Sequence, residues 1–166
     1  ATAAPAAVDT TTVATIAPFT VRADGFGPLE VGMTLKQANE VLGQTLETIP
    51  GTERDSCFFA RWPDHAQNVQ FMFSGGTFAR IDVNSGRSRT DEGVRIGDSE
   101  ARIDSLYPGH VRKTRQKYIV TGNYVIVTPK NPVDSGYRIV FDTEGSAVMK
   151  YRAGRRPEVQ NVEGCG

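Results

Sequence analysis

The feature that most constrains this chain is a segment that occurs twice. Residues 25–43 and 92–109 share one order of residue types: short apolar residues, a glycine, a hydroxyl residue and then a helical pattern. Shifting the first segment by 65 positions aligns Gly32 with Gly97. The other aligned pairs are of like type and are Leu29 with Val94, Val31 with Ile96, Thr34 with Ser99, Ala38 with Ile103 and Val41 with Leu106. Such a chain is expected to consist of two similar halves.

Each copy has the signals of a short helix that begins at a hydroxyl residue. Thr34 and Ser99 occupy N-cap positions, and Gln37, three residues after Thr34, completes a capping box. Gly43 is expected to end the first helix, and Pro108 the second. Helices of about ten residues are unstable alone in water, so both are expected to pack against a sheet.

Alternating apolar residues predict strands after each helix. In the first half, strands are expected at residues 57–62, 69–73 and 77–83, with a glycine turn between the last two. In the second half, strands are expected at residues 117–120, 123–127, 137–141 and 147–151. The segments at 29–31 and 94–96 are expected to be short half-buried strands or extended lead-ins to the helices.

The predicted fold class is α+β: two tandem helix-plus-antiparallel-meander repeats that form a sheet with helices on one face. Residues 18–89 are assigned to repeat one and residues 90–166 to repeat two, as one structural unit. Residues 1–17 are almost wholly Ala, Thr, Val and Pro, which cannot bury enough apolar surface to become ordered. They are expected to be a disordered tether, of the kind found behind a processing site in exported proteins, or a terminus without a role.

Charge and cysteine content narrow the functional classes. The 166 residues include 19 basic and 19 acidic side chains without a long basic run, so no nucleic-acid partner is expected. No apolar run approaches the roughly 20 residues of a membrane span. If the chain is exported, Cys57 and Cys165 are expected to form a disulfide that ties the tail to the first repeat. The alternative is two unrelated thiols.

The start of the first helix also suggests a family. Its motif consists of Val31, Gly32, Met33, Thr34, Gln37, Leu42 and Gly43. This motif resembles the helix start of the β-lactamase-inhibitor-protein-like superfamily, a group of exported bacterial tandem-repeat proteins that includes the SmpA/OmlA-type lipoproteins. The resemblance covers in outline about residues 20–165. It implies an exported, non-enzymatic module that binds another protein.

An enzymatic function is not expected. His65 and His110 stand apart from any partner motif and are expected at surface or capping positions. Cys57 could act as a nucleophile with either histidine, but a disulfide would consume it. Residues 82–86 lack the full ligand set of a calcium loop, and Pro28 removes a donor from the only glycine-rich turn that could cradle phosphate. No catalytic residue, metal or cofactor is therefore expected.

Recognition through a surface is the function that remains. Aromatic and arginine side chains are enriched at protein interfaces, and alternate residues of an antiparallel sheet can face away from the helices. The candidate patch consists of Arg61, Trp62, Tyr118 and Tyr124. The alternative is that these side chains fill the core.

A second candidate is a basic tail that could meet an acidic partner, although such a tail can also be a solvated surface. It consists of Arg152, Arg155 and Arg156, near Glu158 and Glu163.

Three functional hypotheses follow. The first is an exported protein, periplasmic, outer-membrane associated or secreted, that binds another protein as an inhibitor or immunity-type protein does. The second is a cell-envelope scaffold lipoprotein of the outer-membrane assembly type, with a lipid anchor upstream of the visible chain. The third, a small hydrolase, requires a pocket that joins His65 or His110 to carboxylates with shifted pKa values.

Overall fold

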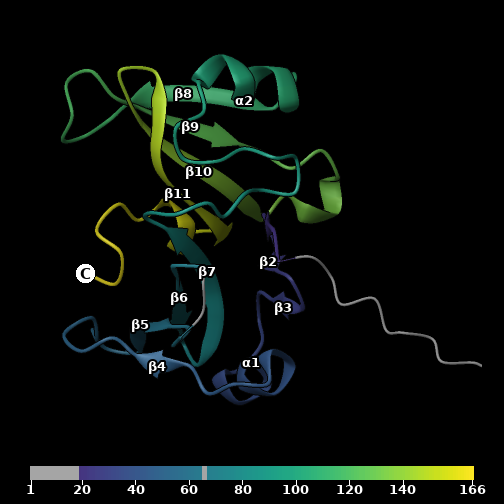
Figure 1. Ribbon diagram of the computed structural model, residues 1–166, viewed down its shortest axis with the longest axis vertical. Helices are drawn as coiled ribbons and strands as arrows, with labels where there is room; N and C mark the ends of the chain where they lie inside the picture. Colours follow the sequence, from purple (N-terminus) through teal and green to yellow (C-terminus); the bar gives the residue numbers. More distant parts are fainter. Residues whose placement is uncertain (1–18, 65–66) are drawn as a thin grey trace, which may run out of the picture.

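The computed structural model describes residues 19–64 and 67–166. Its main feature is an antiparallel sheet of eight strands in the order β4-β5-β6-β7-β11-β10-β9-β8 (Figure 1). The strands are β4 (Glu47–Thr48), β5 (Cys57–Arg61), β6 (Val69–Ser74), β7 (Thr77–Val83), β8 (Val111–Arg115), β9 (Asn123–Val127), β10 (Tyr137–Glu144) and β11 (Ala147–Arg155). The predicted tether at residues 1–17 lies outside the described residues.

Two short α-helices and a small three-stranded sheet complete the described part of the chain. They are α1 (Leu35–Leu42), α2 (Glu100–Leu106), β1 (Val21–Arg22), β2 (Gly25–Phe26) and β3 (Leu29–Glu30), with the 3-10 turns η1 (Pro132–Asp134) and η2 (Glu158–Gln160). The structure therefore has the predicted combination of helices and antiparallel strands, and strands dominate it. Within residues 19–64 and 67–166, no helix has the length and apolar character needed to cross a bilayer.

The eight-stranded sheet is assembled from two groups of four strands. Helix α1 precedes β4 to β7 in the chain, and α2 precedes β8 to β11. The last strands of the two groups, β7 and β11, pair in the middle of the sheet, where Ile81 lies opposite Ala153. Figure 1 shows one group on each side of this central pair.

The helix starts agree with the sequence. The hydroxyl of Thr34 accepts the N–H of Gln37, and the side chain of Gln37 accepts the N–H of Thr34, so the predicted capping box is confirmed. The hydroxyl of Ser99 accepts a main-chain N–H three residues further on. Gly43 ends α1 with φ of 66°, a left-handed conformation that glycine adopts without strain. Helix α2 ends two residues before Pro108.

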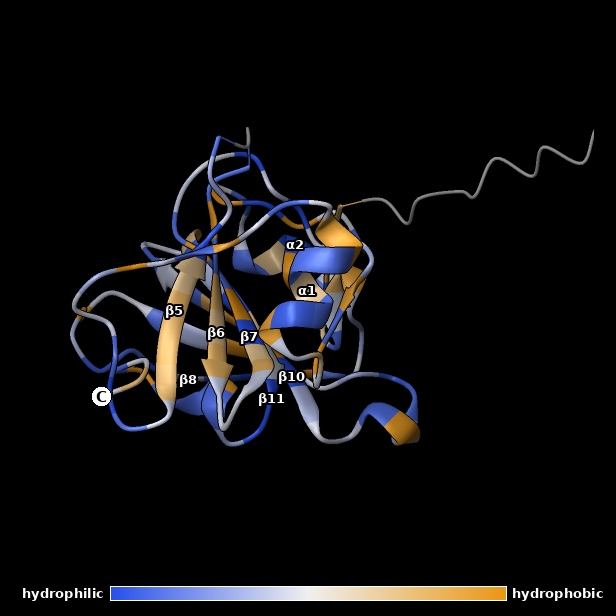
Figure 2. Cartoon of the chain, turned by 90° about the horizontal axis from the view of Figure 1, so that it is seen from below, coloured by the Kyte–Doolittle hydropathy of each residue, from blue (hydrophilic) through white to orange (hydrophobic). Residues whose placement is uncertain are grey.

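One face of the sheet, called the inner face, packs against both helices and the three-stranded sheet. Its fully buried rings are Phe71, Phe73, Phe78, Phe141 and Tyr151. Ala38 of α1, Ile103 of α2 and Phe26 of β2 belong to the same apolar cluster. In Figure 2 both helices lie on the same side of β5, β6 and β7. A single core therefore joins the two groups of strands, because burying this apolar area stabilises both at once.

The opposite face, called the outer face, is crossed by residues 156–166, which we call the strap. Val159 of the strap is buried against Tyr124 and Val140. The strap ends at Cys165, which forms a disulfide with Cys57 at the start of β5. The predicted disulfide is confirmed, and it holds the C-terminal residues across the sheet.

One strand prediction is wrong, because residues 117–120 form a loop that follows β8. Of the two segments expected before the helices, the first contains strand β3 and residues 94–96 form no strand. The loop forms because the side chain of Gln116 accepts two main-chain N–H groups, at 2.6 and 2.9 Å. Strand β8 was not predicted because it lies at the edge of the sheet, where four of its five residues are exposed and apolar alternation is absent.

Candidate functional site

Two residues of the predicted patch, neighbours in the chain, lie on opposite faces of the sheet. Arg61 is exposed on the outer face, and its guanidinium donates to one carboxylate oxygen of Glu47 at 2.7 and 2.9 Å. Trp62 belongs to the core of the inner face, is 8% exposed and packs on Phe19 and Phe26, at centroid distances of 5.1 and 6.1 Å. Trp62 therefore fills the core, and only Arg61 is available to a partner.

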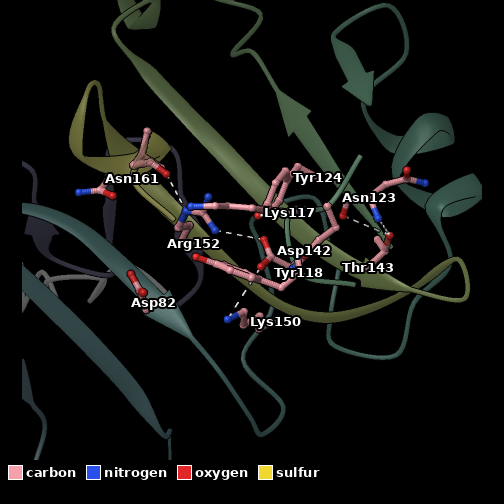
Figure 3. Close-up of polar contacts among 12 residues, drawn as sticks. Asp82, Lys117, Tyr118, Asn123, Tyr124, Asp142, Thr143, Lys150, Arg152 and Asn161 are labelled. Carbon is pink, nitrogen blue, oxygen red and sulfur yellow. Dashed lines mark hydrogen bonds and ion pairs between the residues drawn. The ribbon is translucent and has the colours of Figure 1, made fainter. Parts of the chain in front are cut away.

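Tyr124 lies on the outer face, but the strap covers it. The residue is 9% exposed and packs against Val140 and Val159. The guanidinium of Arg152 lies 5.9 Å from the centre of its ring, and its hydroxyl accepts the main-chain N–H of Lys117 at 3.2 Å (Figure 3). Tyr124 therefore connects the strap and the neighbouring loop to the sheet.

Tyr118 presents an exposed aromatic ring. It lies in the loop formed by residues 116–122, between β8 and β9, and is 61% exposed. Its hydroxyl donates to the carboxylate of Glu163 in the strap. The ammonium group of Lys117 lies 5.1 Å from the centre of the ring and 3.2 Å from the same carboxylate. The ring therefore contacts both the loop and the strap although most of its surface is exposed.

Lys117 and Glu163, which both contact Tyr118, are ionised at neutral pH. Hydrogen bonds with Tyr118 and Glu163 raise the pKa of Lys117, and hydrogen bonds from Tyr118 and Lys117 lower the pKa of Glu163. Val120, two residues further along, is 86% exposed. The loop thus presents an aromatic ring, an aliphatic side chain and an ion pair, a combination typical of protein interfaces.

A row of side chains crosses all eight strands on the outer face. The strand register places each residue directly opposite the next. From β4 to β8 the row is Glu47, Arg61, Gln70, Asp82, Arg152, Val140, Ile126 and Arg112. In the middle of the row Arg152 and Val140 are buried and their neighbours half-buried, whereas Glu47, Arg61 and Arg112 at its ends are exposed. The outer face therefore offers a charged surface on each side of the strap.

Two buried ion pairs hold the strap in place. Arg152 lies 3.1 Å from Asp142, with side-chain exposures of 8% and 1%. Burial raises the pKa of Asp142, although the positive charge of Arg152 opposes this shift. Arg80 makes two hydrogen bonds to Asp82, at 2.8 and 2.9 Å. Both arginines also donate to main-chain carbonyls of the strap, at 2.6 to 2.8 Å.

The three arginines of the predicted basic tail have different environments. Arg152 is buried in the pair just described. Arg155 is half-buried, lies 3.0 Å from Glu158 and donates to the hydroxyl of Thr77 at 2.9 Å. Arg156 is exposed. Only Arg156 is therefore available to an acidic partner.

Glu100 anchors the start of α2 to the sheet. Its carboxylate accepts hydrogen bonds from the Thr143 hydroxyl at 2.6 Å and the Asn123 amide at 2.9 Å, and Lys113 lies 3.7 Å away. Burial alone would raise the pKa of Glu100, but these two hydrogen bonds and the charge of Lys113 outweigh burial, so the pKa is lowered.

Glu100→Gln is expected to remove a pH-dependent part of the stability, about 1 kcal/mol at pH 7. The pKa of Glu100 is lower in the folded than in the unfolded chain, so its carboxylate stabilises the fold fully above pH 4.5. This contribution is lost as the pH falls through the lowered pKa. Urea unfolding at several pH values should show a difference between wild type and variant that shrinks below pH 4.5. The exposed control Glu144→Gln should show no difference, and a pH-independent gap for Glu100→Gln would exclude a role for its charge.

A cavity of about 300 Å³ lies on the other side of the molecule, between the β1–β2 turn, the end of α2 and residues 128–134. Its charged lining residues are Arg22, Asp24, Asp91, Glu92, Lys130 and Asp134. Burial and the charge of Glu92 raise the pKa of Asp91. The buried Tyr107 hydroxyl, at the wall, donates to Thr90 at 2.9 Å. With four acidic and two basic side chains, the cavity could accept a small cationic group.

The described residues give no support to metal or cysteine chemistry. Cys57 forms the disulfide and so has no free thiol. His65 lies outside the described residues. His110 is half-buried just after α2, and its main-chain N–H donates to the carbonyl of Tyr107 at 3.1 Å. Within residues 19–64 and 67–166, no group of three His, Cys, Asp or Glu side chains is placed to hold a metal ion.

The sequence did not predict the contact between Lys117 and Glu163, or the loop position of Val120, which together shape the exposed loop. Lys117 and Glu163 are 46 residues apart, so only the path of the strap brings them together. Val120 was assigned to a strand rather than to a loop. One signal was present: residues 112–117 contain four basic side chains, an arrangement more typical of a solvated edge than of a buried strand.

Comparison with known proteins identifies no family for this chain. No protein-family model matches the chain, and no curated protein matches it.

Proposed function

We propose that this protein is an exported protein-binding module, of the kind that includes inhibitors and immunity-type proteins. It contacts its partner through residues 116–122 and the adjoining outer face. The exposed ring of Tyr118, hydrogen-bonded to the strap, carries this proposal. Aromatic residues anchor interfaces because they bury a large apolar area with few rotatable bonds. A ring already held by Lys117 and Glu163 loses little conformational entropy on binding.

The disulfide supports an exported location, because disulfides persist in oxidising compartments. It also supports the binding surface itself. The bond at Cys165 fixes the end of the strap, and Glu163, two residues earlier, holds Tyr118. An oxidising environment would therefore keep the binding surface in place.

We also propose that the two groups of strands and their helices descend from one duplicated unit. Thr34, the N-cap of α1, forms a bridge with Thr77 at the start of β7, and Ser99, the N-cap of α2, forms one with Ala147 at the start of β11. In each case the glycine two residues before the N-cap donates its N–H to the second residue of that strand, at 2.9 and 2.7 Å. These matching contacts favour the resemblance to the β-lactamase-inhibitor-protein-like superfamily.

Tyr118→Ala is expected to weaken partner binding at least tenfold, since truncation of an anchor residue costs about 2 kcal/mol or more. The immobilised protein would first capture partners from the exported and envelope proteins of the source organism. Dissociation constants would then be measured with the purified partner.

Val133→Ala is the matched control. Val133 is 84% exposed but lies in η1, at the opposite end of β9 from Tyr118. Its removal should leave the affinity unchanged. Equal affinities of the wild type and Tyr118→Ala would contradict the assignment of Tyr118 as an anchor.

A further inference from the structure

Three arginines lie on the outer face of the second group of strands, β8 to β11. Arg112 on β8 is directly opposite Ile126 on β9, which is opposite Val140 on β10. Arg138 is two residues before Val140, and alternate residues of a strand share a face. Arg156 follows the end of β11, which pairs with the start of β10. We call Arg112, Arg138 and Arg156 the arginine cluster.

The positive charge of the arginine cluster is not neutralised within the described part of the chain. No ion pair among residues 19–64 and 67–166 involves any of the three arginines. Burial lowers the pKa of Arg138, and the nearby positive charges of Arg156 and Arg112 lower it further. By contrast, Lys113, also on β8, pairs with Asp104 of α2 at 2.8 Å. The surplus positive charge therefore lies on the outer face.

The cluster is fixed in position at its centre. One guanidinium nitrogen of Arg138 donates to the carbonyls of Ser135 and Tyr137, at 2.7 and 2.6 Å. Arg138 is half-buried, whereas Arg112 and Arg156 are exposed. Ile126, half-buried beside Arg112, adds an apolar surface. Arg112 and the neighbouring Ile126, together with Arg138 and Arg156 further along the same face, form a mixed surface that an anion with an apolar part would match.

The chemistry of guanidinium groups identifies the class of anion. Arginine binds carboxylates and phosphates through paired N–H donors, and such charge-assisted hydrogen bonds are stronger than neutral ones. A polyanion such as nucleic acid is usually met by a broad basic field. Here 19 basic and 19 acidic residues cancel over the chain, so no such broad field is expected. A few carboxylates beside an apolar side chain fit three arginines without an ion pair better.

We propose that the arginine cluster docks an acidic segment of the partner protein, one with at least two neighbouring carboxylates and an apolar side chain that packs on Ile126. This inference rests on the proposed binding function and specifies the chemistry of the partner. Arg112 lies on β8, the strand that leads into residues 116–122, so one partner can contact both the arginine cluster and Tyr118.

A labelled peptide of sequence Glu-Glu-Leu-Asp-Glu tests this inference without the natural partner. Fluorescence anisotropy should show binding that weakens as the salt concentration rises from 50 to 500 mM, because exposed charges are screened. The double variant Arg112→Glu/Arg156→Glu should bind at least tenfold more weakly. Arg87→Glu, at an exposed arginine between β7 and α2, is the matched control and should bind as the wild type does. The amide peptide Gln-Gln-Leu-Asn-Gln should not bind.

Three results would overturn the inference. The first is equal binding of the acidic peptide by the double variant and the wild type, and the second is equal binding of the amide peptide. The third is that inorganic polyphosphate or anionic phospholipid vesicles bind more tightly than the peptide and that the double variant loses this binding. That result would assign the cluster to another class of ligand. A partner lost with Tyr118→Ala but retained by the double variant would reject the cluster and leave the proposed function standing.

Discussion

Removal of the Cys57–Cys165 disulfide is expected to lower the midpoint of thermal unfolding by roughly 10 °C. The bond joins residues 108 positions apart and so restricts the unfolded chain strongly. In the chain-entropy model, a loop of this size is worth at most about 4 to 5 kcal/mol. The loss is expected in the double variant Cys57→Ala/Cys165→Ala and in the wild type treated with a reductant. Calorimetry or circular dichroism would measure both midpoints.

The double variant also provides the control for the reductant. Its own midpoint should not change when reductant is added, because no disulfide remains. The strap keeps its contacts with Arg80 and Arg152 in this variant, so native secondary structure should persist at room temperature. An unchanged midpoint after complete reduction of the wild type would show that the strap is held by these contacts alone.

Arg152→Ala is expected to lower the free energy of unfolding by about 3 to 5 kcal/mol at pH 7. The substitution leaves Asp142, whose side chain is 1% exposed, as a buried charge without its closest partner. It also removes a hydrogen bond of 2.6 Å to the carbonyl of Val159 in the strap. Urea unfolding followed by fluorescence would measure the change.

The pH dependence of the Arg152→Ala variant separates the charge effect from lost packing. Burial already raises the pKa of Asp142, and loss of Arg152 should raise it further. The cost of the buried charge is then complete at high pH and is relieved as the pH falls through the raised pKa. The deficit of the variant should therefore be smaller at pH 4 than at pH 7.

Two further variants complete this test. Arg156→Ala, an exposed arginine four residues further on, should change the stability by less than about 0.5 kcal/mol. Arg152→Met combined with Asp142→Leu should recover most of the lost stability, because an apolar pair can replace a buried ion pair. A cost below about 1 kcal/mol for Arg152→Ala would contradict the role assigned to this pair.

Local sequence signals predicted the elements whose physics is local. Thr34 and Ser99 were recognisable as N-caps because capping depends on residues within one turn of the helix. Strands β6 and β7 were recognisable because both keep apolar residues toward the inner face and turn at adjacent glycines. The disulfide was predictable from two cysteines and the premise of export.

The burial of Tyr124 could not be predicted from its local sequence, because it depends on contacts between distant parts of the chain. Tyr124 has the sequence environment of an exposed strand residue, but a strap that begins more than 30 positions later covers it. Trp62 is different, because side chains alternate along a strand and Arg61 and Trp62 could not both face outward. Strand β8 is polar on account of its edge position, which sequence alone does not reveal.

Hydrogen–deuterium exchange on the complex with the captured partner tests the central claim most directly. If the outer face and the loop at Tyr118 bind the partner, the amides of residues 111–122 should exchange more slowly in the complex than in the free protein. The amides of α1 and of β1 to β3, on the other side of the sheet, should be unchanged. Protection confined to α1 and β1 to β3, with none in residues 111–122, would contradict the account.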